Sequence, residues 1–212
     1  MVGRRGVALV TLMMLLGTMP QPLAAQTIYF PPPYPKRMAP CSPSPKSDGA
    51  PVVSEFEDRW YSKYLSAAAE PSLYQRGQRP RNGDVIRFTW LRSFDPPIIV
   101  RVEGLGAASP QLIAKQLSGP GGYEPGTVNK RIDRHLSPVE ATALRRMLLR
   151  TNVFDLPALD CNGGMDGAEW IIEGAGTDGY RFVARWSPES GKVRETGLAL
   201  LKLTGWTFEK IY

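Results

Sequence analysis

Acidic side chains gather between residues 160 and 173, and their types and spacing suit acid–base chemistry. Asp166, Glu169 and Glu173 are the candidates, because a pair of carboxyl groups can serve as general acid and base in a hydrolase. Glu169 and Glu173 lie four residues apart, which on a strand separates them by about 13 Å. The two carboxyl groups of a glycosidase lie about 5–9.5 Å apart. The two glutamates therefore cannot form such a pair with each other, although either could act with Asp166 or Asp160.

The same segment holds oxygen donors that calcium could use, namely Asp160, Asn162 and Asp166. The EF-hand spacing fails, because Gly164 replaces a donor and Met165 replaces the turn glycine. One histidine and two cysteines are too few for the usual catalytic zinc site. We predict no metal site and no cofactor.

The single histidine, His135, does not complete a catalytic triad. Asp133 and Ser137 flank it, but neighbours in sequence do not have triad geometry. The chain has no Gly-x-Ser-x-Gly and no Ser-x-x-Lys motif of the kind that positions a serine nucleophile. We therefore predict no catalytic residue and keep Asp166, Glu169 and Glu173 as candidate binding residues.

Residues 1–25 have the pattern of a secretory signal peptide. Two arginines precede a mostly apolar stretch, which is too short to span about 30 Å of hydrocarbon comfortably. Small residues at the end of the segment predict cleavage between Ala25 and Gln26, and a short membrane anchor is the alternative. We expect a periplasmic or secreted protein with no stable membrane span after processing.

Residues 26–53 form a proline-rich arm ahead of a single domain, residues 54–212. Eight prolines between residues 31 and 51 favour extended backbone and exclude this stretch from a central sheet. A spacer along the domain is the simpler interpretation, and a proline-rich ligand for a partner's aromatic groove is the alternative. Cys41 in the arm and Cys161 in the domain are the only cysteines, so export predicts a disulfide between them.

Hydrophobic spacing and turn residues in the domain predict an α+β fold: an antiparallel sheet of about five strands, with helices packed on one face. Capping boxes start helices after Ser54 and Ser137, and aromatic residues at every fourth position from Phe56 predict a buried stripe on the first helix. The expected strands are 84–92, 98–104, 111–118, 168–174 and 180–186, and the expected last helix is 192–204.

The loop between the last two strands decides which side chains share a face. A two- or four-residue loop would place Glu169 and Glu173 on the same face as Phe182 and Trp186, which buries carboxyl groups against aromatic rings. A three-residue loop with Gly179 in the left-handed region avoids that cost. We therefore predict the three-residue loop.

The formal net charge of the whole chain is +6, but from residue 54 onward 21 Lys and Arg face 19 Asp and Glu. Basic residues between 130 and 150 could form a patch for nucleic acid or lipid headgroups, and the alternative is a solvated face whose cations near the helix end suit the helix dipole. Since an exported protein meets little nucleic acid, we predict no nucleic-acid partner.

Residues 166–173 (DGAEWIIE), 179–181 (GYR) and 185–188 (RWSP) resemble a recurrent pattern in exported bacterial proteins of unknown function. The resemblance implies a bacterial source and an envelope location, and it implies no activity. We therefore predict a non-enzymatic binding or envelope-accessory module with an envelope protein as partner. A metal-independent hydrolase that uses the acidic residues of the 160–173 segment is the alternative.

Overall fold

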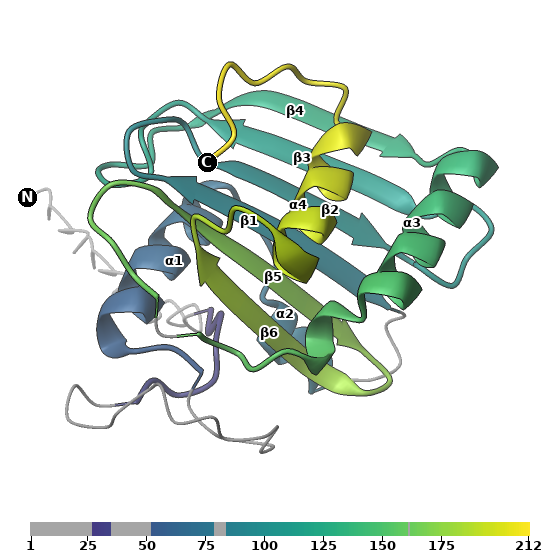
Figure 1. Cartoon of the computed structure of the whole chain (residues 1–212), viewed down its shortest axis with the longest axis horizontal. Helices are drawn as coiled ribbons and strands as arrows, with labels where there is room; N and C mark the ends of the chain where they lie inside the picture. The colour runs from purple at the N-terminus through teal and green to yellow at the C-terminus, as the bar shows by residue number, and fades with distance from the viewer. Residues whose placement is uncertain (1–26, 35–51, 79–83, 161) are drawn as a thin grey trace, which may run out of the picture.

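The structure, a computed structural model, describes residues 27–34, 52–78, 84–160 and 162–212. Figure 1 shows the helices and strands in chain order. They are α1 (Glu55–Ala67), α2 (Leu73–Gly77), β1 (Val85–Arg92), β2 (Ile98–Glu103), β3 (Gln111–Leu117), β4 (Val128–His135), α3 (Pro138–Thr151), a short 3-10 helix (Val153–Asp155), β5 (Ala168–Gly176), β6 (Gly179–Trp186) and α4 (Gly191–Leu203).

Several predictions about the amino-terminal part lie outside the described residues. They are the signal peptide of residues 1–25, its cleavage between Ala25 and Gln26, and the Cys41–Cys161 disulfide. Within the described residues, no helix is both long and apolar enough to cross a membrane.

All the described strands join one antiparallel sheet, in the order β4-β3-β2-β1-β5-β6. The α+β class and the antiparallel pairing are confirmed, and the sheet has six strands where we predicted about five. The additional strand is β4, in which half of the residues are charged and most are exposed. β4 is an edge strand and no helix covers it fully. Its sequence therefore lacks the alternation of apolar and polar residues that identifies a half-buried strand.

Helices cover both faces of the sheet, where we expected them on one. In Figure 1, α3 and α4 lie in front of the sheet, and α1 and α2 lie behind it. The reason is visible in β1, in which all eight residues are buried. Its polar positions Arg87 and Thr89 suggested a solvent-facing side, but that side is covered as well.

The two covered faces differ in chemistry. The α3/α4 face is an apolar core that includes Phe88, Trp90 and Trp170. The indole N–H groups of Trp90 and Trp170 both donate to the carbonyl of Tyr212, at 2.9 and 2.8 Å. The α1/α2 face combines an aromatic core around Tyr61 with buried charged side chains. The buried titratable groups of the described residues are therefore concentrated on this side of the sheet.

The predicted three-residue loop between β5 and β6 is wrong. Gly176 pairs with Gly179, so only two residues connect the strands, and Gly179 has a φ of 81°. Glu173 is consequently opposite Phe182, on the α1/α2 face, and Glu169 is opposite Trp186. Burial of Glu173 on this face is tolerated because Arg87 supplies an opposite charge and Tyr180 supplies a hydroxyl donor.

Candidate functional site

A buried charge cluster lies on the α1/α2 face, and its five members are Glu70, Arg87, Arg101, Lys115 and Glu173. Arg87 binds Glu173 at 2.7 and 2.8 Å through two of its nitrogens. Glu70, which follows α1, accepts from Arg101 at 2.7 Å and from Lys115 at 2.6 Å. These side chains are almost fully shielded from solvent, and each charge has an opposite charge beside it.

Glu173 therefore has a structural role. Its second oxygen accepts from the Tyr180 hydroxyl at 3.0 Å, so both oxygens have partners. Burial raises the pKa of Glu173, and Arg87 opposes that rise by stabilising the charged form. A carboxyl group with no exposed surface and two filled oxygens is not available to a ligand.

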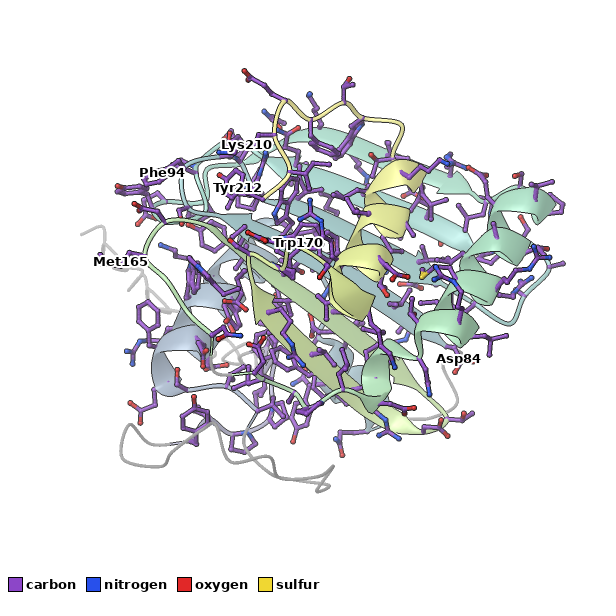
Figure 2. The ribbon with its side chains drawn as sticks, viewed as in Figure 1. Asp84, Phe94, Met165, Trp170, Lys210 and Tyr212 are labelled. Carbon is purple, nitrogen blue, oxygen red and sulfur yellow. The ribbon has the colours of Figure 1, made fainter. Side chains whose placement is uncertain are left out.

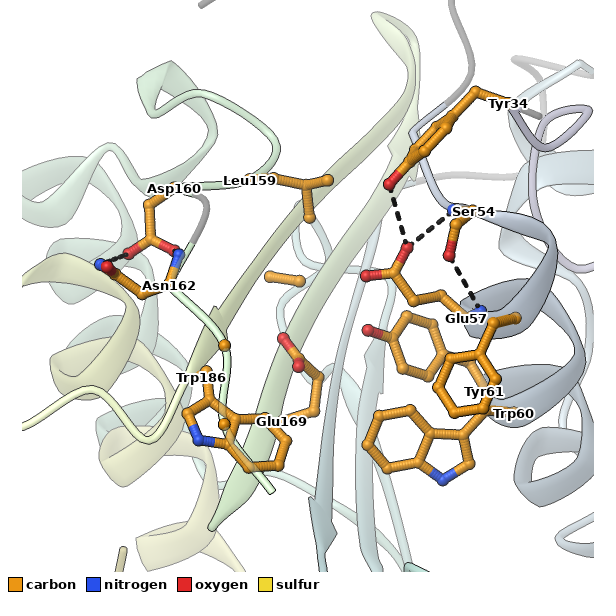
Figure 3. Close-up of a pocket in the computed structure, with 14 residues that line it drawn as sticks. Tyr34, Ser54, Glu57, Trp60, Tyr61, Leu159, Asp160, Asn162, Glu169 and Trp186 are labelled. Atoms are coloured by element: carbon orange, nitrogen blue, oxygen red, sulfur yellow. Dashed lines mark hydrogen bonds between the residues drawn. The ribbon is translucent and has the colours of Figure 1, made fainter. Parts of the chain in front are cut away.

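Glu169 has a different environment, because it lines a cavity of about 300 Å³ that we call the inner pocket (Figure 3). The pocket lies between α1, the end of the amino-terminal arm, the loop before β5, and β6. Its lining residues are Tyr34, Ser54, Phe56, Glu57, Trp60, Tyr61, Leu159, Asp160, Asn162, Gly163, Gly164, Glu169, Ala184 and Trp186.

The pKa of Glu169 is raised to about 8, so the carboxyl group is mostly neutral at pH 7. Burial is the largest cause, since only 9% of the residue is exposed. The negative charges of Glu57 and Asp160 raise it further, while Arg185 and the Tyr61 hydroxyl lower it. Glu169 has no ion-pair partner among the described residues, which distinguishes it from Glu173.

Tyr61 and Glu57 approach Glu169 from α1, as Figure 3 shows. Tyr61 is 1% exposed, and its hydroxyl makes no well-aligned hydrogen bond with the described residues. Burial and the acidic neighbours raise the pKa of Tyr61 well above its usual value, so the hydroxyl keeps its proton. Glu57 is fixed by the capping box of α1, in which it accepts from the Ser54 amide at 2.7 Å.

Two tryptophans form walls of the inner pocket. In Figure 3 the Glu169 carboxyl lies between the ring of Trp186 on one side and Trp60 with Tyr61 on the other. Trp60 is held by its indole N–H, which donates to the Gly121 carbonyl at 2.8 Å. Gly164 allows the loop before β5 to lie on Trp186, since a Cβ there would be 2.4 Å from the indole nitrogen.

A second, more open cavity of about 660 Å³ adjoins the first, and we call it the outer groove. It shares four lining residues with the inner pocket: Phe56, Trp60, Gly164 and Trp186. Its other lining residues are Arg59, Lys63, Ser93, Phe94, Gly122, Tyr123, Met165 and Asp166. Figure 2 shows Phe94 and Met165 at the same end of the sheet.

Backbone hydrogen bonds tie the loops of the outer groove to each other. The Ser93 amide donates to Gly167 at 2.9 Å, and the Gly122 amide donates to Ser93 at 3.0 Å. The Lys63 ammonium group donates to the Tyr123 carbonyl at 2.6 Å, which links α1 to the same loops. The groove is therefore formed before any ligand arrives, as is usual for binding sites.

The structure separates the three acidic residues that the sequence singled out. Asp166 lines the outer groove, Glu169 lines the inner pocket, and Glu173 belongs to the buried charge cluster. His135 lies at the end of β4, where its Nδ1 is 3.1 Å from the Ser109 carbonyl oxygen. No group of three His, Cys, Asp or Glu side chains in the described residues is arranged to hold a metal ion.

Sequence reasoning missed the contribution of α1. The spacing of its aromatic residues predicted a buried stripe, but Phe56 is 61% exposed, and Trp60 lines both cavities. Glu57 was interpreted as a capping residue, which it is, yet its carboxyl group also lines the inner pocket. An aromatic stripe too wide for one buried face of a helix was the signal that could have shown this.

In comparisons with known proteins, no family model matches the chain and no curated protein matches it.

Proposed function

We propose that the protein is an exported, non-enzymatic binding module, and that the outer groove is where it holds a polypeptide segment of an envelope partner. The observation that carries the proposal is the convergence of exposed apolar side chains on this groove. Phe56, Phe94, Tyr123 and Met165 are between 61% and 93% exposed, and they come from four separate segments of the chain. Contiguous exposed apolar surface of this kind marks interaction sites.

The groove suits a polypeptide better than a small apolar ligand. It is open to solvent, and aromatic rings and a methionine provide adaptable contacts for apolar side chains. Arg59 and Lys63 lie along the α1 side, and Asp166 lies on the opposite loop. Charged groups at the rim of an apolar centre are the usual arrangement of a protein–protein interface.

Site-specific cross-linking tests the proposal. A photo-cross-linking amino acid at position 94 should capture a defined envelope protein in cells, whereas the same residue at position 139 should not. Val139 on α3 is 79% exposed and lies away from the groove, so it is a matched control. The same cells test export: the mass of the mature chain should show the loss of residues 1–25, and retention of those residues would contradict the proposed location.

Affinity measurements with the purified partner then decide whether the groove is the binding surface. Phe94→Ser combined with Met165→Ser should weaken binding by at least about tenfold, the loss expected for two interface contacts. Val139→Ser combined with Leu149→Ser, also highly exposed, should leave binding unchanged. Equal binding by both double variants would reject the groove as the site.

A metal-independent hydrolase is the second candidate. Glu169 lines a pocket, and because its pKa is about 8 it carries a proton at pH 7, as a general acid must. Hydrolysis of a panel of chromogenic glycosides and esters tests it. Turnover that Glu169→Gln abolishes would support the hydrolase, and no turnover by the wild-type protein would leave the binding module as the only candidate of the two.

A further inference from the structure

We infer that the inner pocket is a binding site for an organic ammonium group, and that a lysine side chain of the segment held in the outer groove supplies it. The second half of the inference rests on the proposed function. The first half depends only on the residues that line the inner pocket, and it can be tested without any partner.

The charge of the lining residues favours a cation. Three carboxyl groups line the inner pocket, those of Glu57, Asp160 and Glu169, and no Lys, Arg or His does so among the described residues. Arg185 neutralises part of this charge from outside the lining, through its ion pair with Asp160 at 3.4 Å. Glu57 has no cation of the described residues within ion-pair distance, so the pocket retains negative charge.

The Tyr61 hydroxyl is close enough to Glu169 to lower the pKa of that carboxyl group, yet it makes no well-aligned hydrogen bond with the described residues. A buried hydroxyl without a well-aligned hydrogen bond is costly, and native proteins leave few of them. Tyr61 lines the pocket, is 1% exposed, and has no such bond with the described residues. An ammonium group beside Glu169 would join these groups in one hydrogen-bond network. In it, the Tyr61 hydroxyl would donate to Glu169, and the ammonium group would donate to the carboxylates of Glu169 and Glu57.

The walls of the pocket explain why the cation should be organic. Trp60 and Trp186 lie on opposite sides of Glu169, and aromatic faces attract alkylammonium groups. A metal ion would need several converging oxygen ligands, and no such group exists among the described residues. An alkyl chain can instead run along the tryptophan rings and enter from the outer groove, since both tryptophans line both cavities.

Binding should be linked to loss of a proton from Glu169. The groups that act on it are Glu57 and Tyr61 from α1, Asp160 from the preceding loop and Arg185 from β6. Apart from Arg185, none of these groups brings positive charge, so Glu169 is mostly neutral at pH 7 when no cation is bound. A bound ammonium group would favour the ionised form. Below pH 8 the affinity should therefore rise about tenfold per pH unit, because only the ionised fraction is competent to bind.

The experiment uses the mature protein and n-butylammonium as the probe, with butan-1-ol as its neutral counterpart. The indole N–H signals of Trp60 and Trp186 report binding by NMR at pH 6, 7, 8 and 9. We expect saturable shifts with n-butylammonium, an affinity that rises with pH and levels above pH 8, and no comparable effect of butan-1-ol. Absence of shifts, or equal shifts with both probes, would overturn the inference.

Two variants isolate the proposed contacts. Glu169→Gln keeps the shape of the neutral acid, so the protein should fold, yet the affinity for n-butylammonium at pH 8 should fall at least about tenfold and lose its pH dependence. Glu209→Gln, the same substitution at an exposed residue that lines neither cavity, is the control and should bind as the wild type does. A pH dependence that survives in Glu169→Gln would contradict the assignment to Glu169.

A peptide separates this inference from the proposed function. Acetyl-Phe-Lys-Phe-amide should bind more tightly than n-butylammonium, because it fills the outer groove as well, and its norleucine counterpart should bind more weakly than the lysine peptide. If n-butylammonium binds but the lysine peptide gains nothing, the ammonium site stands and the polypeptide groove fails. If neither binds, the ammonium site itself fails.

Discussion

Glu169 and Glu173 lie on the same face of the same strand, four residues apart, and their surroundings are opposite. Glu173 is enclosed by the buried charge cluster, with Arg87 on one oxygen and Tyr180 on the other. Glu169 is nearly as buried, but it faces a cavity and other acids and lacks an ion pair with the described residues. The comparison shows that burial alone does not identify a functional acid.

What distinguishes the two is whether the protein itself supplies the compensating group. A buried charge is tolerated when opposite charges and donors surround it, and such an arrangement stabilises one structure. A buried acid at the wall of a cavity, with a perturbed pKa and a neighbouring hydroxyl that lacks a well-aligned hydrogen bond, is instead characteristic of a functional site. The predictions that follow test this difference, in order of expected size.

Arg87→Met should have the largest effect, because it leaves Glu173 buried without its cation. We expect a loss of about 3–5 kcal/mol in the free energy of unfolding at pH 7, the usual cost of removing one partner of a buried pair. Urea denaturation followed by tryptophan fluorescence measures it. A loss below about 1 kcal/mol would mean that Glu173 can be accommodated as a neutral acid, as Glu169 is, and the contrast between the two glutamates would disappear.

Glu169 should make the stability depend on pH in the direction opposite to an ion-paired acid. Its pKa is about 8 in the folded protein and lower in the unfolded chain, so between about pH 5 and pH 8 the folded state holds the extra proton. The stabilisation is fully present below pH 4 and is lost as the pH rises to 8, at up to about 1.4 kcal/mol per pH unit.

The measurement compares urea denaturation of the wild type and Glu169→Gln at pH 5, 6, 7 and 8. The wild type should lose stability relative to the variant across this range, because glutamine cannot ionise. The difference between the two proteins removes the contribution of all other titrating groups that the mutation leaves unchanged. Parallel curves would show that Glu169 is ionised already at pH 5, which would remove the basis of its special role.

The sequence predicted most of the framework, because local signals and tertiary structure agree there. Both capping boxes form, with the side chain of Ser54 accepting from the Glu57 amide at 3.2 Å and that of Ser137 from the Glu140 amide at 3.3 Å. The strands of the meander and the hairpin were found from their alternating apolar residues. The edge strand β4 was missed, since an exposed edge has little reason to alternate.

The candidate site was harder to predict, because it depends on contacts between residues that are far apart in the sequence. The hairpin register depends on Arg87, 86 residues before Glu173 in the chain, and on Tyr180. The sequence of the hairpin contains only the unfavourable term, the burial of Glu173, and not its compensation by Arg87. The register predicted from the hairpin alone was therefore wrong. Glu169 was selected as a candidate, but Tyr61 and Trp60 were not, since the sequence does not reveal which helix covers which acid.

The disulfide between Cys41 and Cys161 remains a prediction, and the structure describes residues that lie on either side of each cysteine. Tyr34 and Val53, which lie on either side of residues 35–51, are joined by a backbone hydrogen bond of 3.0 Å. Asp160 and Asn162, the neighbours of Cys161, both line the inner pocket. Thiol titration of the denatured, unreduced protein should find no free thiol, and two thiols per chain would reject the Cys41–Cys161 disulfide.

Tyr180→Phe should have a moderate effect, because it removes a donor from a buried carboxylate. We expect a loss of about 1.5–3 kcal/mol in the free energy of unfolding, the range for a hydrogen bond to a charged group. Urea denaturation at pH 7 measures it. A change within about 0.5 kcal/mol of zero, as for an ordinary surface substitution, would show that Arg87 alone satisfies Glu173.

Tyr61→Phe is the matched substitution at the other glutamate, and it should have the smallest effect on stability. Its hydroxyl has no well-aligned hydrogen bond to lose among the described residues, so we expect a change within about 0.5 kcal/mol of zero, or a slight gain from removing an unsatisfied buried group. Urea denaturation at pH 7, beside Tyr180→Phe, measures the pair under one condition. If Tyr61→Phe instead costs as much as Tyr180→Phe, the Tyr61 hydroxyl already has a strong hydrogen-bond partner within the protein. Its role would then be structural, and the difference between Glu169 and Glu173 would rest on the Arg87 ion pair alone.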